Sequence, residues 1–303
     1  MVVGEESEEQ RGEGQGEAEE PIWEHVYELI IRLRKALIAV VVAAVVLSAI
    51  PIETHSWAPL IVVFPRLIIK YVVPKQVSIF GSTYNVTIMP ETPFESFEVI
   101  LYSAILLGVI GASPVIAYEI WAYIKPALYP HEEKMIKKYV GLSVLLFLMG
   151  VGLAVGFLAP VTYRITLSLY PLLAPAGYPV IVRVSVKDVV TFTVLLALAS
   201  GLVFEIPLII YLLLANGVID PDFFKPETMK FALLAIAIVA ALLSPDPSGM
   251  GMLMLTISLY LPFYIAVKLG KKAYYERQKK LEEEEGGEGE GVREAEQRAG
   301  LPA

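Results

Sequence analysis

Hydrophobic residues along this chain gather into six long segments separated by polar, proline-rich or charged stretches. A helix needs about 20 mostly apolar residues to cross the roughly 30 Å hydrocarbon core of a bilayer. Because several of the segments reach that length, the pattern predicts a chain that crosses a membrane repeatedly. The segments are residues 36–50, which the amphipathic stretch 21–35 extends, 99–124, 139–159, which Pro160 closes, 189–214, 231–243 and 250–267.

The last two segments are short for a crossing. Residues 231–243 would span only about 20 Å at about 1.5 Å per residue, and a tight Ser-Pro-Asp-Pro-Ser-Gly turn joins them to residues 250–267. Such a pair forms either a re-entrant hairpin that never crosses or a true crossing in locally thinned lipid. The next polar segments are strongly basic, as cytoplasmic segments are, and this favours the crossing.

Residues 51–98 form a long connection between the first two segments. It contains an apolar stretch, residues 59–73, which Pro65 interrupts and which also carries Arg66 and Lys70. We expect an interfacial pair of helices over the bundle here, and the proline and the two charges argue against the alternative of a seventh span. No inverted repeat is visible, which weakens the interpretation as a secondary transporter.

Basic residues set the orientation of the predicted bundle. With the N-terminus inside, the cytoplasmic flanks and loops hold fifteen Lys and Arg residues and the outside loops hold six. This bias predicts both termini in the cytoplasm. The fold class is therefore an all-α integral membrane protein with six transmembrane helices, N-in and C-in, the last two short, in the cytoplasmic membrane.

The composition agrees with a membrane protein and locates the acidity in the tails. Of 303 residues 56% are hydrophobic, the mean hydropathy is +0.62, and the formal net charge is −8. Residues 1–20 carry −7 and residues 282–303 carry −6, so the body between them is +5. We expect a disordered acidic tail (1–20), a membrane domain (21–268), and a basic then acidic cytoplasmic tail (269–303), largely disordered. An acidic stretch before the first apolar run makes a signal peptide unexpected.

Few residues in this chain could carry chemistry. The sequence has no Cys and only three widely separated His residues, so no metal site or other cofactor is expected. There is no P-loop and no Ser/His/Asp set of suitable spacing, so no enzyme is predicted. Gly152 and Gly156 form a GxxxG spacing, which Gly108 and Ala112 repeat loosely, and such spacing favours close helix packing.

Glu205 lies in the middle of the apolar run 192–214, and no other charged residue stands between Asp188 and Asp220. Placing a charge at that depth costs several kcal/mol, roughly 2.5 or more on the insertion scale. A carboxyl group kept there can serve as a proton carrier or as a hydrogen-bonding partner inside the bilayer. It can also be paired within the helix bundle and contribute to packing alone.

Carboxylates also gather on the predicted cytoplasmic face. Glu24, Glu28 and Arg32 follow one another at intervals of four on one helical face, and the first cytoplasmic loop supplies Glu132 and Glu133. A Glu–Arg pair at this spacing is usually a modest surface ion pair. Acidic groups on an otherwise basic face could instead bind a cationic peptide through Arg–carboxylate pairs.

Four blocks of the chain make it resemble a known family, the C component of the twin-arginine protein translocase. The resemblance covers residues 21–268. The blocks are HVYELIIRLRKALI (25–38), TPFESF (92–97), SPVIAYEIWAYIKPALYPHEEK (113–134) and FTVLLALASGLVFEIPLII (192–210).

The resemblance implies a receptor for signal peptides that carry two consecutive arginines. It also implies single-span A and possibly B partner components, a homo-oligomer within the complex, and transport of folded proteins driven by the protonmotive force. Nucleic acid is not an expected partner. A proton-coupled secondary transporter that uses Glu205 is the alternative, and a membrane scaffold without transport is a third class.

The resemblance also assigns roles to individual residues. The signal-binding carboxylates fall on Glu28 and Glu132, with Arg32 as a basic position of the same site and Tyr123 as its aromatic residue. The intramembrane glutamate that contacts a partner helix falls on Glu205.

Three prolines, Pro59 in the outside loop and Pro114 and Pro126 in the third block, are expected to be structural. The chain departs from the family pattern at Ile30, where an arginine is usual, and Asp246 does not align securely with the family aspartate.

Overall fold

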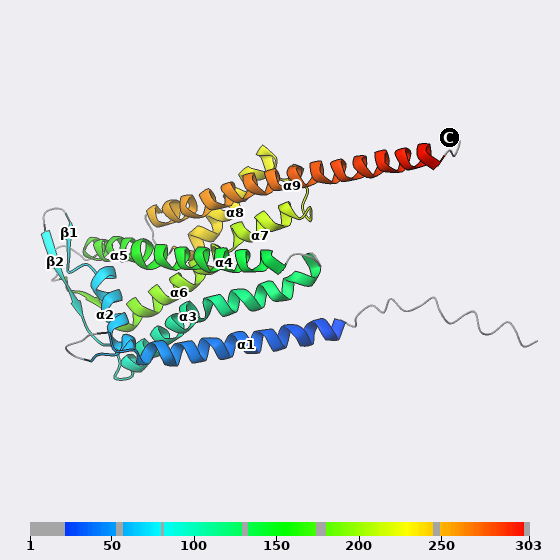
Figure 1. The fold of residues 1–303 in the computed structure, drawn as a ribbon. Coiled ribbons are helices and arrows are strands. Elements are labelled where there is room, and N and C mark those ends of the chain that lie inside the picture. The colour runs from blue at the N-terminus through cyan, green and yellow to red at the C-terminus, as the bar shows by residue number, and fades with distance from the viewer. Residues whose placement is uncertain are drawn as a thin grey trace, which may run out of the picture.

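The computed structural model describes residues 22–52, 57–79, 82–128, 133–173, 180–244 and 249–299. Helices run back and forth between two ends of an elongated bundle (Figure 1). α1 begins and α9 leaves at the same end, and a small sheet lies at the opposite end. Following the positive-charge bias, we call these the cytoplasmic end and the outer end.

Six long helical passages cross the bundle, as predicted. Within the part of the chain that the structure describes, five helices are long and apolar enough to span a membrane: Glu95–Tyr123, Tyr139–Leu173, Val186–Ala215, Pro226–Leu243 and Met250–Lys279. The sixth is α1 (Ile22–Ala49), which lies along α3 (Glu95–Leu128). A Cβ atom added to Gly108 of α3 would lie 2.7 Å from the carbonyl oxygen of Val40, so glycine allows α1 to approach closely.

The third passage is longer than predicted, because Pro160 does not end it. α4 (Glu133–Leu153) continues through a π-helical turn (Ala154–Leu158) into α5 (Ala159–Leu173). Proline lacks an N–H group, and its ring collides with the carbonyl four residues earlier in a regular α-helix. The π turn lies directly before Pro160 and widens the helix at that point, which relieves this conflict.

The crossing of α4 and α6 (Val186–Val203) depends on glycines other than the predicted pair. A Cβ atom on Gly150 would lie 2.6 Å from the carbonyl oxygen of Ser200, and one on Gly201 would lie 2.5 Å from the Phe147 ring. Around Gly152 and Gly156 there is nothing within 4 Å of an added Cβ atom. Among the described residues no other helix therefore approaches the GxxxG pair closely, and the predicted close packing at this pair is wrong.

The outer connection is one helix and a hairpin, which corrects the prediction of a helix pair. α2 (Leu60–Val72) runs through Pro65 without breaking, and Val63, Pro65, Ile68 and Val72 of α2 are buried. Antiparallel strands β1 (Gln76–Ile79) and β2 (Ser82–Ile88) follow. β3 (Val182–Val184) pairs in parallel with β2, with Val86 opposite Val182.

A buried carboxylate reinforces this link between the two outer connections. Glu95, at the start of α3, is only 3% exposed. Its Oε1 accepts hydrogen bonds from the Ser185 hydroxyl and the Lys187 backbone N–H, both at 2.7 Å, and its Oε2 accepts one from the Glu91 N–H at 2.6 Å. Glu95 thereby ties the start of α3 to the start of α6.

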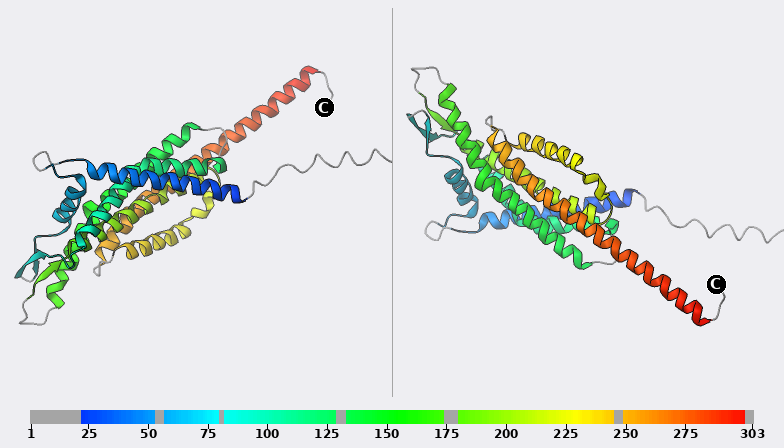
Figure 2. Two further views of the ribbon diagram at one scale, coloured as in Figure 1. Left: turned by 90° about the horizontal axis from the view of Figure 1, so that it is seen from below. Right: turned by 90° about the horizontal axis from the view of Figure 1, so that it is seen from above.

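The last two passages pack at the side of the bundle (Figure 2). α7 (Ile206–Ala215) is followed by a 3-10 turn (Pro221–Phe224) and α8 (Pro226–Leu243), which lies beside α9 (Met250–Ala299). α8 has 18 residues, or about 27 Å. It is longer than the predicted 13-residue run and lies near the lower limit of length for a crossing.

α9 continues to Ala299, through most of the tail that we expected to be largely disordered. Glu, Lys, Arg, Gln and Ala dominate this part of the chain and are good helix formers. Residues 1–20 lie outside the described residues.

Candidate functional site

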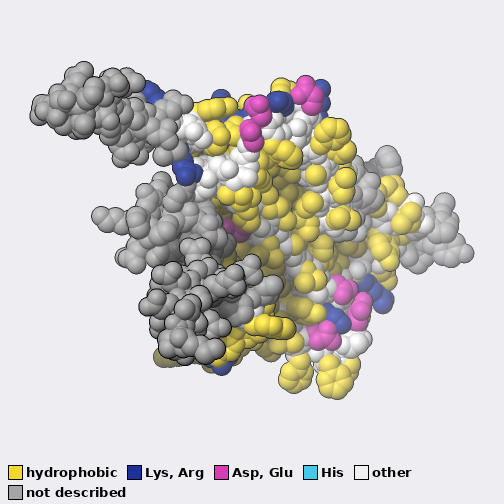
Figure 3. Space-filling model, turned by 90° about the vertical axis from the view of Figure 1, so that its right-hand side faces the viewer, with side chains coloured by type: hydrophobic (Ala, Val, Ile, Leu, Met, Phe, Trp, Pro, Cys, Tyr) yellow, Lys and Arg dark blue, Asp and Glu magenta, His cyan; other side chains and the backbone are white. Residues whose placement is uncertain are grey.

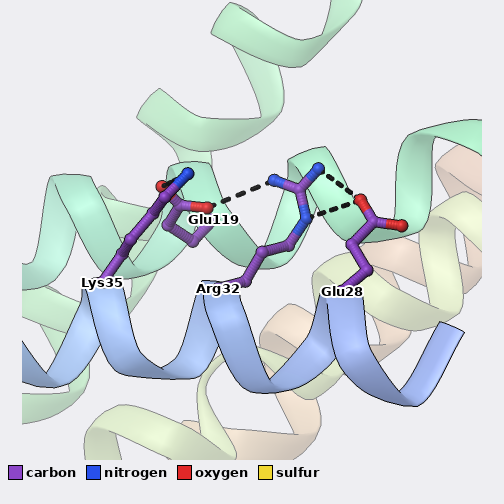
Figure 4. Close-up of polar contacts among 4 residues, drawn as sticks. All are labelled: Glu28, Arg32, Lys35 and Glu119. Carbon is purple, nitrogen blue, oxygen red and sulfur yellow. Dashed lines mark hydrogen bonds and ion pairs between the residues drawn. The ribbon is translucent and has the colours of Figure 1, made fainter. Parts of the chain in front are cut away.

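A chain of charged side chains joins α1 and α3 near the cytoplasmic end (Figure 4). Arg32 donates from Nε and Nη2 to Oε1 of Glu28, at 2.9 and 2.6 Å, and from Nη1 to Oε2 of Glu119, at 3.2 Å. Lys35 Nζ lies 4.0 Å from the other oxygen of Glu119. The side chains are 40% exposed for Glu28, 22% for Arg32 and 10% for Glu119, so this row of charged side chains runs from the surface into the bundle.

Helical spacing places these groups on facing surfaces. Glu28 and Arg32 are four residues apart on α1, so they lie one turn apart on one face. Glu119 and Tyr123 have the same spacing on α3, which puts the half-buried Tyr123 one turn nearer the cytoplasmic end. The close packing of α1 on α3 then brings Arg32 within reach of both carboxylates.

An open cavity lies beside Glu28. It measures about 590 Å³ and is lined by Trp23, Tyr27, Glu28, Ile31, Arg32 and Lys35. The Trp23 and Tyr27 rings are exposed. Figure 3 shows the cytoplasmic end, where acidic and basic side chains gather in groups with hydrophobic side chains between them. The cavity thus combines a carboxylate with aromatic surfaces, and a guanidinium can both pair with the first and stack on the second.

Glu205 stands at a break in the fourth passage. α6 ends at Val203 and α7 begins at Ile206, with Glu205 as its N-cap residue and Pro207 in its first turn. Pro207 cannot donate to the carbonyl of Val203, and this interrupts the helix. The Glu205 carboxyl group accepts a hydrogen bond from the buried Ser143 hydroxyl of α4, between Oε2 and Oγ at 2.8 Å.

A second cavity, of about 490 Å³, lies beside this pair. Residues of α4, α7 and α9 line it, among them Leu142 and Leu146 on α4 and Pro207 and Leu208 on α7. Leu142 directly precedes Ser143 in the sequence and Pro207 lies two residues after Glu205, so residues close in sequence to this hydrogen-bonded pair line a mostly apolar cavity.

The comparison with known families decides the identity of this arrangement. Residues 24–257 match the family model described as TatC, Sec-independent protein translocase protein. This chain belongs to the TatC family.

Individual relatives within the TatC family agree with this match. The TatC of Aquifex aeolicus is 31% identical over 196 residues, which cover 64% of this chain and 78% of the relative. The TatC of Carboxydothermus hydrogenoformans is 28% identical over 246 residues, 81% of this chain and 92% of the relative. A crystal structure titled as the twin arginine translocase receptor TatC superposes with a TM-score of 0.60 at 27% identity, covering 82% of this chain and 99% of that one.

Membership of the TatC family confirms the main sequence predictions. The chain is a multi-pass protein of the cytoplasmic membrane and a component of a Sec-independent protein translocase. The six-span architecture agrees with the solved TatC structures.

The structure describes some of the predicted site residues of this TatC-family chain and not others. It brings Glu28 and Arg32 together and places Tyr123 one helical turn from their partner Glu119. Glu132 and Asp246 lie outside the described residues, and Pro126 lies within α3, where its side chain is not described.

The structure also describes the other two predicted prolines, Pro59 and Pro114. Pro59 precedes the first residue of α2, and its carbonyl accepts the N–H groups of Val62 and Val63. Pro114 within α3 leaves the carbonyl of Ile110 without its usual donor. The Ser113 hydroxyl donates to that carbonyl at 2.7 Å and replaces the missing bond.

Sequence reasoning missed Glu119 and Ser143. Glu119 is an isolated acid in an apolar helix, four residues before Tyr123, and this spacing was a usable signal. Nothing local marks Ser143, because its importance comes from Glu205, which lies 62 positions away along the chain.

Proposed function

We propose that this TatC-family protein is the receptor for twin-arginine signal peptides and the core of a translocase that uses the protonmotive force to move folded proteins. The half-exposed Glu28 carboxylate beside the aromatic cavity carries this proposal. A signal arginine paired there would gain about 1.5–3 kcal/mol from a charged hydrogen bond. It could also stack on the exposed Trp23 or Tyr27 rings.

Selection of arginine over lysine follows from the shape of the two cations. A guanidinium offers a planar fork to a carboxylate, whereas an ammonium is a point charge. We assign the second arginine of the peptide to Glu132, which the resemblance makes the second signal-binding carboxylate and which follows Tyr123 by nine residues in the sequence.

The test is the binding of a fluorescent signal peptide to the purified protein in detergent. We expect the Arg-Arg peptide to bind more tightly than its Lys-Lys counterpart, and Glu28→Gln and Glu132→Gln to weaken that preference. Glu98→Gln is the matched control, since Glu98 is 39% exposed and pairs with Lys187 at 2.7 Å on the outer end. Equal binding of both peptides to the wild type would refute the proposed receptor function.

For the partner components, we propose that the single-span helix of an A or B component contacts Glu205. Sequence neighbours of the hydrogen-bonded Ser143–Glu205 pair line a mostly apolar cavity that a partner helix with a polar side chain could enter. Glu205→Gln retains a hydrogen-bonding group and should preserve cross-linking to the partner, whereas Glu205→Ala should lose it. Equal cross-linking in the two variants would contradict this role.

A further inference from the structure

Glu28 already holds a guanidinium, that of Arg32. Nε and Nη2 of Arg32 both donate to Oε1, and Figure 4 shows the second oxygen of Glu28 turned away from Arg32. A carboxylate oxygen has about two lone-pair sites, so Arg32 fills both sites of Oε1. An arginine forms its strongest pair with a carboxylate as a fork on both oxygens. A peptide arginine therefore cannot complete that fork on Glu28 until Arg32 leaves Oε1.

Glu119 offers Arg32 a second place to bind. Nη1 of Arg32 already donates to Glu119 Oε2 at 3.2 Å, and Lys35 is 4.0 Å from Oε1. A guanidinium has five N–H donors. When Nε and Nη2 release Glu28, Arg32 can keep its Nη1 bond and turn Nη2 toward the same carboxylate. The charge of Arg32 then stays paired with a carboxylate. Pairing matters at this place because only 10% of the Glu119 side chain is exposed, so water offers little compensation for a lost partner.

We infer that Arg32 is a resident competitor that occupies Glu28 until a signal peptide displaces it, and that Glu119 is the carboxylate that retains the displaced Arg32. This inference rests on the proposed receptor function. It gives Glu119 a role in peptide affinity without any contact between Glu119 and the peptide.

The competition has a definite thermodynamic signature. Only the fraction of receptors whose Glu28 is free can bind, and the apparent dissociation constant rises as that fraction falls. This factor is the same for both peptides, because the positive charge of Arg32 at Glu28 repels an incoming ammonium as it repels a guanidinium. Changes in Arg32 or Glu119 should therefore shift the affinities for the Arg-Arg and Lys-Lys peptides by one common factor and leave their ratio unchanged.

Two substitutions should change the apparent dissociation constants of both peptides in opposite directions. Arg32→Lys holds Glu28 with a single ammonium in place of two donors, so both peptides should bind more tightly, by about tenfold for one charged hydrogen bond. Glu119→Gln removes the charge that retains the displaced Arg32, so both peptides should bind more weakly by a similar factor. Glu98→Gln on the outer end is the control and should change neither affinity.

Each outcome of the titrations decides the question. Tighter binding by Arg32→Lys and weaker binding by Glu119→Gln, with the wild-type ratio kept, support the inference. Weaker or unchanged binding by Arg32→Lys overturns it, because Arg32 would then assist the peptide or merely join α1 to α3. A changed peptide ratio in Glu119→Gln also overturns it, because Glu119 would then touch the peptide.

Three further results are interpretable. If Glu119→Gln does not fold, the Arg32→Lys titration alone decides. A wild-type protein that selects between the peptides while the variants behave like the wild type refutes only the competition. A wild-type protein that binds neither peptide refutes the receptor function, and the competition with it.

Discussion

Replacing Glu95 by Gln tests whether the buried carboxylate holds the outer end together. The carboxylate accepts three hydrogen bonds of 2.6–2.7 Å, two on Oε1 and one on Oε2. A glutamine can place its carbonyl oxygen where Oε1 lies and keep the bonds from Ser185 and Lys187. Its NH₂ group then faces the Glu91 N–H, where two donors meet.

The expected loss of stability follows from this exchange. One charged hydrogen bond disappears, which costs about 1.5–3 kcal/mol, and a donor in a buried site is left without an acceptor, which costs about 1–3 kcal/mol. We take about 3 kcal/mol as the total. At about 2–4 °C per kcal/mol for a chain of 150–250 residues, the melting temperature should fall by about 6–12 °C.

The assay is thermal unfolding in detergent, with amide hydrogen exchange as a local readout. Exchange should accelerate first at the Glu91 amide, whose acceptor is lost. Glu98→Gln is the control, because Glu98 lies one turn further along α3, is 39% exposed and makes an ion pair worth about 0–1 kcal/mol. If Glu95→Gln melts at the same temperature as Glu98→Gln, Glu95 does not stabilise the outer end and the reasoning fails.

Three other predictions follow from the helices. Gly150→Ala should destabilise by about 1–3 kcal/mol through overpacking against the Ser200 backbone, while Gly152→Ala on the open side of the same helix should be tolerated in the same unfolding assay. Ile30→Arg should leave signal-peptide affinity unchanged, because Ile30 is exposed and lies about 200° around α1 from Arg32; weaker or tighter binding would contradict this. Four leucines inserted into α8 add about 6 Å and should reduce transport of a folded cargo without loss of folding; normal transport would remove the support for a thinned bilayer.

The spans could be predicted because membrane insertion depends on local composition. Long apolar runs must form helices in lipid, where every backbone group needs an internal partner. The same reasoning failed at Pro160 and Pro65, where a π turn and a single lost hydrogen bond accommodate proline within a continuing helix. Local sequence does not show whether such an adjustment will occur.

Features that depend on distant segments could not be predicted. β2 pairs with β3 across almost a hundred residues, and the weakly apolar stretch 76–88 gave no sign of that partner. Likewise, the choice of Gly150 over Gly152 depends on which face of α4 meets α6. Glu28 and Arg32 could be paired from their spacing alone, whereas Glu119 required knowing that α1 lies against α3.

The parallel pairing of β2 with β3 also has a mechanical consequence. Together with Glu95, it fastens the outer ends of two successive helical hairpins, α1 with α3 and α4–α5 with α6. Helices fastened at one end move most at the other. The 28-residue α1 is about 42 Å long at about 1.5 Å per residue, so a small tilt at the outer end becomes a displacement of several ångströms at the cytoplasmic end. We therefore expect the outer end to act as a stiff hinge, so that tilting of the helices moves their cytoplasmic ends furthest. At that end Arg32 joins α1 to α3 through contacts that an arriving peptide can exchange.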